Sequence, residues 1–380
     1  MWKKKRFLVS DVYSLGMTLH FMLFGQPAYN GVSAVVACGQ RSPRPVEIPP
    51  GCPEDLRRLL AGMLEKNPLK RWSLDQVLTA IRARLERLAV PCLALRVGQS
   101  RGERIWHARH RQFSMEFVWI PPGTFLMGMA GATGSDRAEE PCDVRCTPLH
   151  RVRVDGFWMS RHPVTRGQFR FFVKDSGYKT GADQAGWAHA YDPDRRGFVR
   201  REGSNWLRPG FAQEEDHPVV NVSYADALEF AEWLSWRCHR LVRLPTEAEW
   251  ERACRAGGQQ RYGCGEEITA ELANFGGLRV GTTPVGRFPV NRFGLLDMHG
   301  NVHEWVRDWF REDFYAVSPE RNPYCDQSDS GQRVLRGGGW LSPAERIRSA
   351  SRDRYPPESA DGDIGFRLSG MAYAWEGGRN

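Results

Sequence analysis

The fold is decided by the stretch Asn291-Arg-Phe-Gly-Leu-Leu-Asp-Met-His-Gly-Asn-Val-His-Glu-Trp305. This stretch is one of six motifs that follow one another through most of the chain. The other five, in chain order, are Ile120-Pro-Pro-Gly-Thr-Phe-Leu-Met-Gly128, His217-Pro-Val-Val-Asn-Val-Ser223, Arg243-Leu-Pro-Thr-Glu-Ala-Glu-Trp250, Arg336-Gly-Gly-Gly-Trp340 and Ile364-Gly-Phe-Arg-Leu368. With 14 Trp, 39 Gly and 24 Pro in 380 residues, the composition predicts short strands and ordered loops around aromatic cores rather than a helical bundle.

Local patterns around these motifs predict both strands and helices. Residues 117–128 indicate two short strands around a Pro-Pro-Gly turn. Residues 150–155 alternate basic and apolar side chains, as a strand with one buried face does. Three helix starts are predicted from capping residues, at Thr165, at Ser223 with Asp226, and at the capping box Thr246-Glu-Ala-Glu249, whose helix runs to Gly257.

Charge and cysteine content exclude several classes of protein. The net charge of +8 is concentrated in residues 1–86, where 13 Lys and Arg stand against 7 Asp and Glu, so no basic stripe for nucleic acid runs through the rest. Nine Cys, an odd number without regular spacing, argue against a disulfide scaffold. The basic start resembles a signal peptide, but Asp11 and His20 interrupt its apolar run, which is too short to span a membrane. We expect a cytoplasmic protein without a membrane span or nucleic-acid partner.

Taken together, the six motifs resemble the formylglycine-generating enzyme (sulfatase-modifying factor) family over about residues 113–370. The resemblance implies an α+β domain with a C-type-lectin-like fold and much irregular loop. Residues 87–112 are predicted to be a linker that leads into this domain, and residues 371–380 a tail.

The first region, residues 1–86, resembles the C-terminal part of the large lobe of a serine/threonine protein kinase. Helices are predicted over residues 10–29, over residues 54–65 and from Ser73 onward. Asp11 and Arg71 match the family's central-helix Asp and its late Arg. Within the 380 residues there is no Gly-rich loop with a strand Lys, no His-Arg-Asp loop and no Asp-Phe-Gly motif, so we expect a truncated helical fragment without phosphoryl transfer.

The oxidase chemistry of the resembled family is not expected either. Its enzymes use two Cys after the Gly-Gly-x-aromatic motif to hold copper, because Cu(I) prefers thiolates. The corresponding residues 340–355 contain no Cys. A three-His iron site is also poorly supported, since the five histidines considered are scattered and His303 replaces the Trp expected in its motif. These five are His150, His162, His217, His299 and His303.

The resemblance also implies a calcium site. The family places hard-cation sites where Asn274-Phe275 and Gly300-Asn301-Val302-His303-Glu304 stand, and amide, carbonyl and carboxylate oxygens suit Ca²⁺. The alternative is that Asn301 and Glu304 only hydrogen-bond the loop backbone. The candidate ligands are Asn274, Phe275, Asn301, Val302 and Glu304, and no cofactor is required.

The segment 340–364 has the pattern of a display surface. Residues that resemble the family framework alternate there with residues of mixed charge and size that show no helical or strand period. This spacing resembles the variable proteins of diversity-generating retroelements, in which adenine-directed mutagenesis randomises surface residues. The candidate variable, ligand-binding residues are Leu341, Ser342, Pro343, Arg346, Ser351, Asp353, Arg354, Tyr355, Ser359, Asp361, Gly362 and Asp363.

These patterns predict a non-catalytic display protein whose C-terminal surface binds a macromolecular ligand, most simply a protein. Rigid Gly, Trp and Arg positions would hold the backbone while the exposed side chains vary. One alternative is an oxidase of the formylglycine-generating type, or an inactive paralogue of it. A second alternative is a kinase-related signalling protein.

Overall fold

The computed structural model describes residues 54–65, 70–73, 76–77, 79–80, 94–100, 103–110, 113–130, 144–238 and 240–371. The chain divides into two compact units, Met1–Pro91 and Cys92–Asn380. Each unit is described by itself below. The predicted helix over residues 10–29, with Asp11, and the predicted tail after Met371 lie outside the described residues.

The described part of the first unit is a small helical cluster. Helix α3 (Glu54–Met63) confirms the helix predicted over residues 54–65. Its Leu59 and Met63 pack with Val77 to form a buried cluster. Ser73 accepts a hydrogen bond from the backbone N–H of Gln76, which fits the predicted helix start at Ser73. Arg71 is buried and donates to the carbonyl of Glu65 at 2.7 Å.

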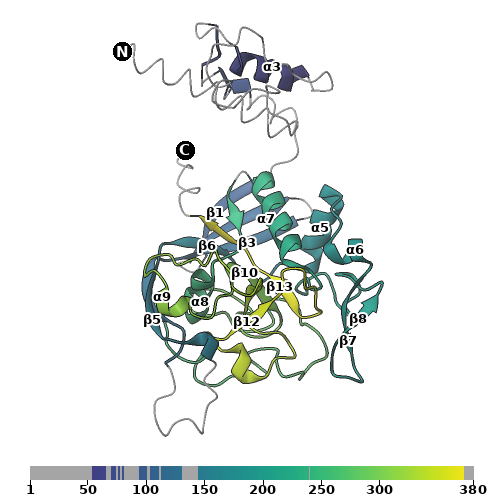
Figure 1. Ribbon diagram of the computed structural model, residues 1–380, viewed down its shortest axis with the longest axis vertical. Helices are drawn as coiled ribbons and strands as arrows, with labels where there is room; N and C mark the ends of the chain where they lie inside the picture. The colour runs from purple at the N-terminus through teal and green to yellow at the C-terminus, as the bar shows by residue number, and fades with distance from the viewer. Residues whose placement is uncertain are drawn as a thin grey trace. The chain divides into compact units, whose positions relative to one another are not determined.

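The second unit is built on two sheets and two hairpins (Figure 1). The six-stranded sheet has the order β1 (Ala94–Ser100), β2 (Glu103–His110), β3 (Phe113–Ile120), β6 (Phe157–Ser160), β14 (Ser369–Met371) and β9 (Val242–Arg243). The four-stranded sheet has the order β12 (Arg352–Tyr355), β11 (Arg333–Arg336), β10 (His303–Trp309) and β13 (Ile364–Phe366). The hairpins are β4 (Gly123–Met127) with β5 (His150–Val154), and β7 (Trp187–Asp192) with β8 (Gly197–Glu202).

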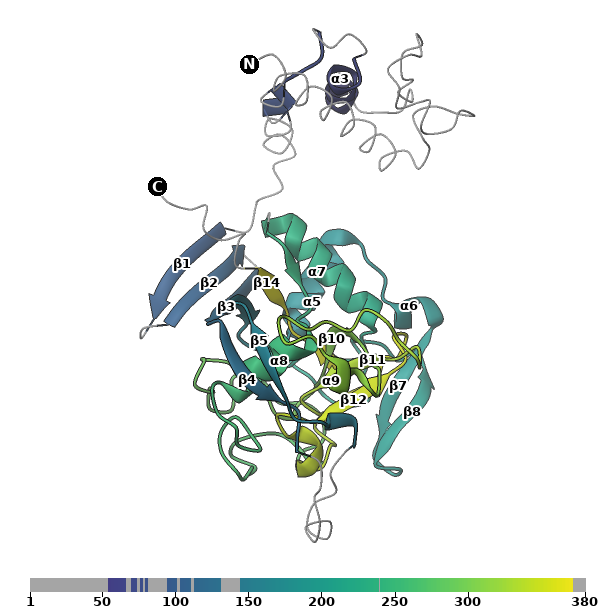
Figure 2. The ribbon, with the colours of Figure 1, turned by 60° about the vertical axis from the view of Figure 1, so that its left-hand side comes forward.

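The predicted linker over residues 87–112 is wrong from Ala94 onward. Strands β1 and β2 form an antiparallel hairpin there, and β2 continues into the sheet by pairing with β3. Figure 2 shows β1, β2 and β3 side by side. The strands therefore begin about twenty residues before position 113, because β2, at Glu103–His110 in the basic run, pairs with strands on both sides.

The three helix starts predicted for this domain are confirmed. Helices α5 (Arg166–Ser176) and α8 (Glu247–Arg255) begin at the capping boxes of Thr165 and Thr246, and α7 (Tyr224–Cys238) follows Ser223. Two short helices, α6 (Gly181–Ala185) and α9 (Phe314–Val317), complete the α-helices described here. Phe169 and Phe172 of α5 pack on Phe230 of α7, and this aromatic core also contains Trp305 and Phe366 from the second sheet. The mixture of sheets and helices confirms the α+β prediction.

The turn predictions also agree with the structure. Strands β3 and β4 flank Pro121-Pro122, and β5 alternates buried and exposed residues as expected. Gly337 and Gly338 follow β11 with φ values of +86° and +71°, a backbone region in which other residues are strained. These glycines turn the chain out of the second sheet and into the segment 340–364.

Candidate ligand-binding face

Trp340 fixes the two ends of the segment 340–364 to each other. Its ring is buried and lies edge-on to the rings of Tyr191, Phe198 and Phe211, at centroid distances of 4.8, 5.9 and 5.4 Å. Its indole N–H donates to the carbonyl of Gly362 at 3.2 Å. The segment is therefore closed into a loop whose base is a buried aromatic cluster.

Two buried arginines, Arg336 and Arg352, hold residues 349–352 in the middle of the segment from the core side. Arg336 of β11 donates to the carbonyls of Ser349, Ala350 and Ser351 and forms an ion pair with Glu251. Arg352 binds Glu247 of α8 through two hydrogen bonds of 2.7 and 2.9 Å. Buried Arg–Glu pairs of this kind fix one geometry, since breaking one leaves an uncompensated charge. These two arginines therefore hold the backbone behind the candidate surface from its buried side.

Eight of the twelve predicted surface residues reach solvent. Pro343 and Arg346 are exposed, and the other six are half-buried. We call these eight the rim residues: Leu341, Ser342, Pro343, Arg346, Asp353, Arg354, Tyr355 and Ser359. The structure thus supports a surface location for most of the predicted set.

The prediction is wrong for Ser351, Asp361, Gly362 and Asp363, which are all buried. A Cβ added at Gly362 would lie 2.8 Å from the ring of Phe198, so no larger residue fits without rearrangement. The Ser351 hydroxyl donates to the carbonyl of Glu345 at 2.9 Å. These positions belong to the supporting structure and not to a freely variable surface.

Asp361 and Asp363 lie beneath the rim in a group of ionisable residues. We call Asp353, Asp361 and Asp363 the aspartate cluster. Asp361 is 8% exposed and its Oδ1 lies 2.6 Å from Nδ1 of His189 on β7. Asp363 is 7% exposed, and its Oδ2 lies 4.0 Å from Nε2 of His303 on β10. Asp353 of β12 is half-buried and pairs with Arg145 at 3.2 Å.

The electrostatics of this group follow from burial and from like charges. Burial, and then the carboxylates of Asp361 and Asp353, raise the pKa of Asp363 well above its ordinary value. Burial also raises the pKa of Asp361, although His189 opposes that shift. The pKa of Tyr355 rises to about 12, because burial and all three aspartates disfavour its phenolate. Tyr355 therefore remains a neutral donor beside the aspartate cluster.

Ser342 and His303 form the one contact in this group that resembles catalytic machinery. The Ser342 hydroxyl lies 3.2 Å from Nε2 of His303 and accepts a hydrogen bond from the N–H of Gly339 at 3.0 Å. A Ser-His-Asp triad needs its carboxylate on the other ring nitrogen, Nδ1. Asp363 instead lies on the Nε2 side, and Nδ1 of His303 is buried without a partner. The arrangement is not a catalytic triad.

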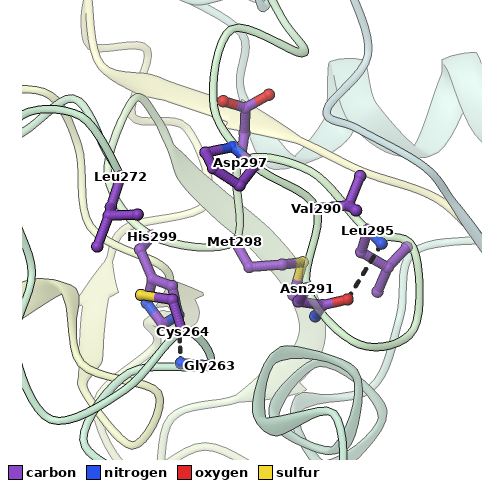
Figure 3. A pocket seen from close by; sticks show the side chains of 10 residues that line it. Gly263, Cys264, Leu272, Val290, Asn291, Leu295, Asp297, Met298 and His299 are labelled. Atoms are coloured by element: carbon purple, nitrogen blue, oxygen red, sulfur yellow. Dashed lines mark hydrogen bonds between the residues drawn. The ribbon is translucent and has the colours of Figure 1, made fainter.

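A second candidate site is the pocket in Figure 3, which contains Cys264 and His299. His299 is committed on both ring nitrogens, with Nδ1 2.7 Å from the carbonyl of Ile347 and Nε2 accepting from the N–H of Gly263 at 2.8 Å. Burial raises the pKa of Cys264, and Figure 3 shows the Asp297 carboxylate turned away from it. With no free base and no lowered thiol pKa, this pocket does not activate a nucleophile.

The residues predicted to bind calcium do not form a free cation cradle. Both carboxylate oxygens of Glu304 accept from the guanidinium of Arg367, at 2.6 and 2.7 Å, and the Trp250 indole donates to one of them. Oδ1 of Asn301 accepts from the N–H of Thr283 at 2.8 Å. A positive guanidinium on the set's one carboxylate disfavours a second cation there, so the residues do not fit calcium as a set.

The remaining members of that set have structural surroundings. Val302 is fully buried and Phe275 is half-buried. The carbonyl of Asn274 accepts from the N–H of Asn301 at 2.8 Å, and the Asn274 amide donates to Gly281. Within the described ranges, no group of three or more His, Cys, Asp or Glu is arranged to hold a metal ion.

Sequence reasoning missed the aspartate cluster as a unit. It assigned Asp361 and Asp363 to the surface, did not consider His189, and treated His303 as an isolated histidine. The spacing Asp361-Gly-Asp363 just before the motif Ile364-Gly-Phe-Arg367, together with His303 in place of a Trp, was the available signal.

The comparisons with known proteins agree with this geometry. Residues 104–370 match the family model described as the sulfatase-modifying factor enzyme 1-like domain. The formylglycine-generating enzyme of Streptomyces coelicolor is 35% identical over 294 residues, covering 67% of this chain and 89% of that enzyme. The two sheets, the irregular loops and the matched residues define a C-type-lectin-like domain. The chain belongs to the formylglycine-generating enzyme family.

Other relatives are larger than this chain. The serine/threonine-protein kinase pkn1 of Chlamydia caviae is 37% identical over 256 residues, which are 67% of this chain and 38% of that kinase. The chain therefore spans less than half the length of this relative. The family domain occupies residues 104–370, and only 113 of the 380 residues lie outside it. More than half of the 256 residues aligned with the kinase must therefore lie in the family domain.

Two solved structures resemble the chain. PvdO from Pseudomonas aeruginosa has a TM-score of 0.57 and 30% identity, covering 67% of this chain and 94% of PvdO. Variable protein 1 of Treponema denticola has a TM-score of 0.50 and 19% identity, covering 70% of this chain and 98% of that protein. The second likeness is of fold alone. Among the helices that the structure describes, none combines the length and apolar character needed to cross a membrane.

Proposed function

We propose that this chain is a non-catalytic binding protein whose rim residues contact a protein ligand. The observation that carries the proposal is the separation of roles in the segment 340–364. Trp340, Arg336 and Arg352 fix the backbone from the buried side, and the eight rim residues reach solvent, with Ser342 and Asp353 each also accepting one nearby backbone N–H. A surface of this kind tolerates different side chains, because its support is elsewhere.

The oxidase alternative lacks its chemical groups at this face. Residues 340–355 contain no thiol, and Ser342 stands three residues after the last glycine of the Gly-Gly-Gly turn, next to His303. A serine hydroxyl does not replace a thiolate as a ligand for Cu(I). The kinase alternative would need phosphate- and metal-binding motifs that these 380 residues do not contain.

Diversification of the rim is the finer part of the proposal. The pattern of segment 340–364 supports it, and the fold is one that a Treponema variable protein also has. If the rim is diversified, the gene should lie near a partial copy of this segment and a reverse transcriptase, with adenine differences confined to codons of the rim residues. A copy with differences at the Gly362 codon, or no copy, would count against diversification.

Binding itself is tested by selection on the full chain. Peptides selected from a random phage-displayed library should lose binding to Tyr355→Ala and keep binding to Trp236→Ala, an exposed aromatic on α7 outside the segment. Peptides that are insensitive to Tyr355→Ala and Leu341→Asp would overturn the proposal. Conversion of a Cys-containing sulfatase peptide in the presence of copper, seen as a mass loss, would instead establish the oxidase.

The compartment is also part of the proposal. Among the residues that the structure describes, Cys238, Cys254, Cys264 and Cys325 form no disulfide, which fits the reducing cytoplasm. A cytoplasmic location is therefore proposed for the chain.

A further inference from the structure

The buried glutamates of the second unit have a consistent feature: each has its own arginine. Glu304 pairs with Arg367 at 2.6 Å, and Glu247 with Arg352 at 2.7 Å. The remaining pairs are Glu249 with Arg243 and Glu251 with both Arg255 and Arg336. This is the usual way to bury a carboxylate, since an unpaired buried charge is costly.

Two other buried aspartates are compensated differently, by backbone N–H groups. Asp308 accepts from the N–H groups of Glu247 and Cys325 at 2.8 and 2.9 Å. Asp297 accepts from the N–H of Gly286 at 3.1 Å. The fold thus supplies a donor from another residue to each of these acids.

Asp363 departs from both patterns. Within the described part of the chain its carboxylate has no hydrogen bond to another residue, and its nearest cationic group is the imidazole of His303 at 4.0 Å. Burial lowers the pKa of His303, so that ring is largely uncharged at neutral pH. The charges that act most strongly on Asp363 are the carboxylates of Asp361 and Asp353. The aspartate cluster therefore has three carboxylates and one arginine, Arg145.

Contacts with the surrounding fold fix the positions of the three aspartates. Asp363 packs on Gly339, where an added Cβ would lie 2.3 Å from Oδ2. Asp353 lies on β12, and Asp361 is fixed through His189 and through its carbonyl, which accepts from the N–H of Asn221 at 3.0 Å. Tyr355 stands two residues after Asp353 on β12, its ring is half-buried, and the three carboxylates raise its pKa. A ring beside carboxylates is a setting that suits a guanidinium or an ammonium.

We propose that the aspartate cluster binds a positively charged group, a guanidinium or ammonium, presented by an Arg or Lys side chain of the protein ligand. The proposal rests on the function proposed above and adds the chemistry of the partner. The ligand's cation takes the place that an arginine of the chain itself occupies beside each buried glutamate. The rim residues then contact the rest of the ligand.

The test uses the full chain in metal-free buffer with EDTA and saturation-transfer NMR. The probes are Nα-acetylarginine amide and its neutral isostere Nα-acetylcitrulline amide. The arginine probe should bind at least tenfold more tightly than the citrulline probe. Asp363→Asn and Asp361→Asn should each weaken arginine binding at least tenfold, whereas Glu358→Gln, an exposed acid of the same segment, should leave it unchanged.

The source of the cation is decided with two further probes. The pentapeptide Gly-Gly-Arg-Gly-Gly should bind more tightly than agmatine, because the rim contacts backbone as well. If agmatine binds as tightly as the pentapeptide or more tightly, the proposal that the cation belongs to a protein ligand is overturned. Equal binding of citrulline, no effect of Asp363→Asn, or binding of Zn²⁺ or Ca²⁺ that displaces the arginine probe would overturn the inference. If selected peptides still need Tyr355 while the arginine probe fails, the proposed function stands and this inference alone fails.

Discussion

The arginine-paired glutamates of the core and the aspartate cluster of the C-terminal face handle buried charge in opposite ways. In the core, Glu251 lies against Arg336 and Arg255, and every partner is fully buried with it. At the face, Asp363 is also buried, at 7% exposed, but the carboxylates of Asp361 and Asp353 raise its pKa further. In the core, an arginine beside each buried glutamate fixes the local geometry. At the C-terminal face, Asp363 has no arginine partner among the described residues, so its carboxylate is the group that a ligand's cation can pair with.

The largest change in the free energy of unfolding is expected for the arginine–glutamate pairs of the core. Arg336→Met should lower the free energy of unfolding by about 3–5 kcal/mol, because it leaves Glu251 without one of its partners and three carbonyls without a donor. Urea unfolding followed by tryptophan fluorescence measures it. As a control, Arg170→Met breaks an exposed pair with Glu215 and should cost no more than about 1 kcal/mol. Equal costs for the two variants would remove the distinction between the regions.

The next effect concerns the support of the aspartate cluster. Gly339→Ala should lower the free energy of unfolding by about 1–3 kcal/mol, because the new methyl group collides with Asp363. In an Asp363→Ala background the cost should be smaller, since the colliding carboxylate is gone. The double-mutant cycle tests this by urea unfolding. Strict additivity would show that the two residues do not touch.

For Asp363, which has no arginine partner among the described residues, we expect a substitution to stabilise the protein rather than to destabilise it. Asp363→Asn should raise the free energy of unfolding at pH 7, because the variant removes a buried group whose ionised form the fold disfavours. The folded protein holds a proton on Asp363 more tightly than the unfolded chain does, so wild type loses stability as pH rises from the ordinary Asp range to the raised pKa. The variant lacks that loss, although Asp361, Asp353, His303 and Tyr355 remain. Thermal unfolding from pH 4 to pH 8 measures the difference, and a destabilised variant at pH 7 would contradict it.

The smallest effect is expected on the rim. Arg346→Ala should change the free energy of unfolding by less than about 0.5 kcal/mol, because the side chain is exposed and the backbone is held by Arg336 and Arg352. The same urea experiment measures it. A loss above 1 kcal/mol would mean that the rim helps to hold the loop and cannot vary freely.

Much of the fold could be predicted because its signals are local. The capping boxes at Thr165 and Thr246 and the turn at Pro121-Pro122 each depend on a few neighbouring residues, and the structure has all three. The strands β1 and β2 were missed, because a run rich in arginine hides pairing that depends on a neighbouring strand.

The candidate site was only partly predictable. The segment 340–364 was located, but irregular loop has no period that tells which side chains face inward, so Asp361 and Asp363 were placed at the surface. Their burial depends on distant residues, since His189 is 172 positions from Asp361 in sequence. The surroundings of the predicted calcium ligands were hidden for the same reason, because Glu304 binds Arg367, a partner 63 positions away.

The most direct test of the uncompensated aspartate cluster is the pKa of Asp363 in the full chain, measured by carbon-13 NMR of its side-chain carboxyl. We expect a pKa well above the ordinary Asp range, which should fall when Nα-acetylarginine amide is added and should not change when the citrulline amide is added. An ordinary pKa in the free protein, or one that does not respond to the arginine probe, would contradict it.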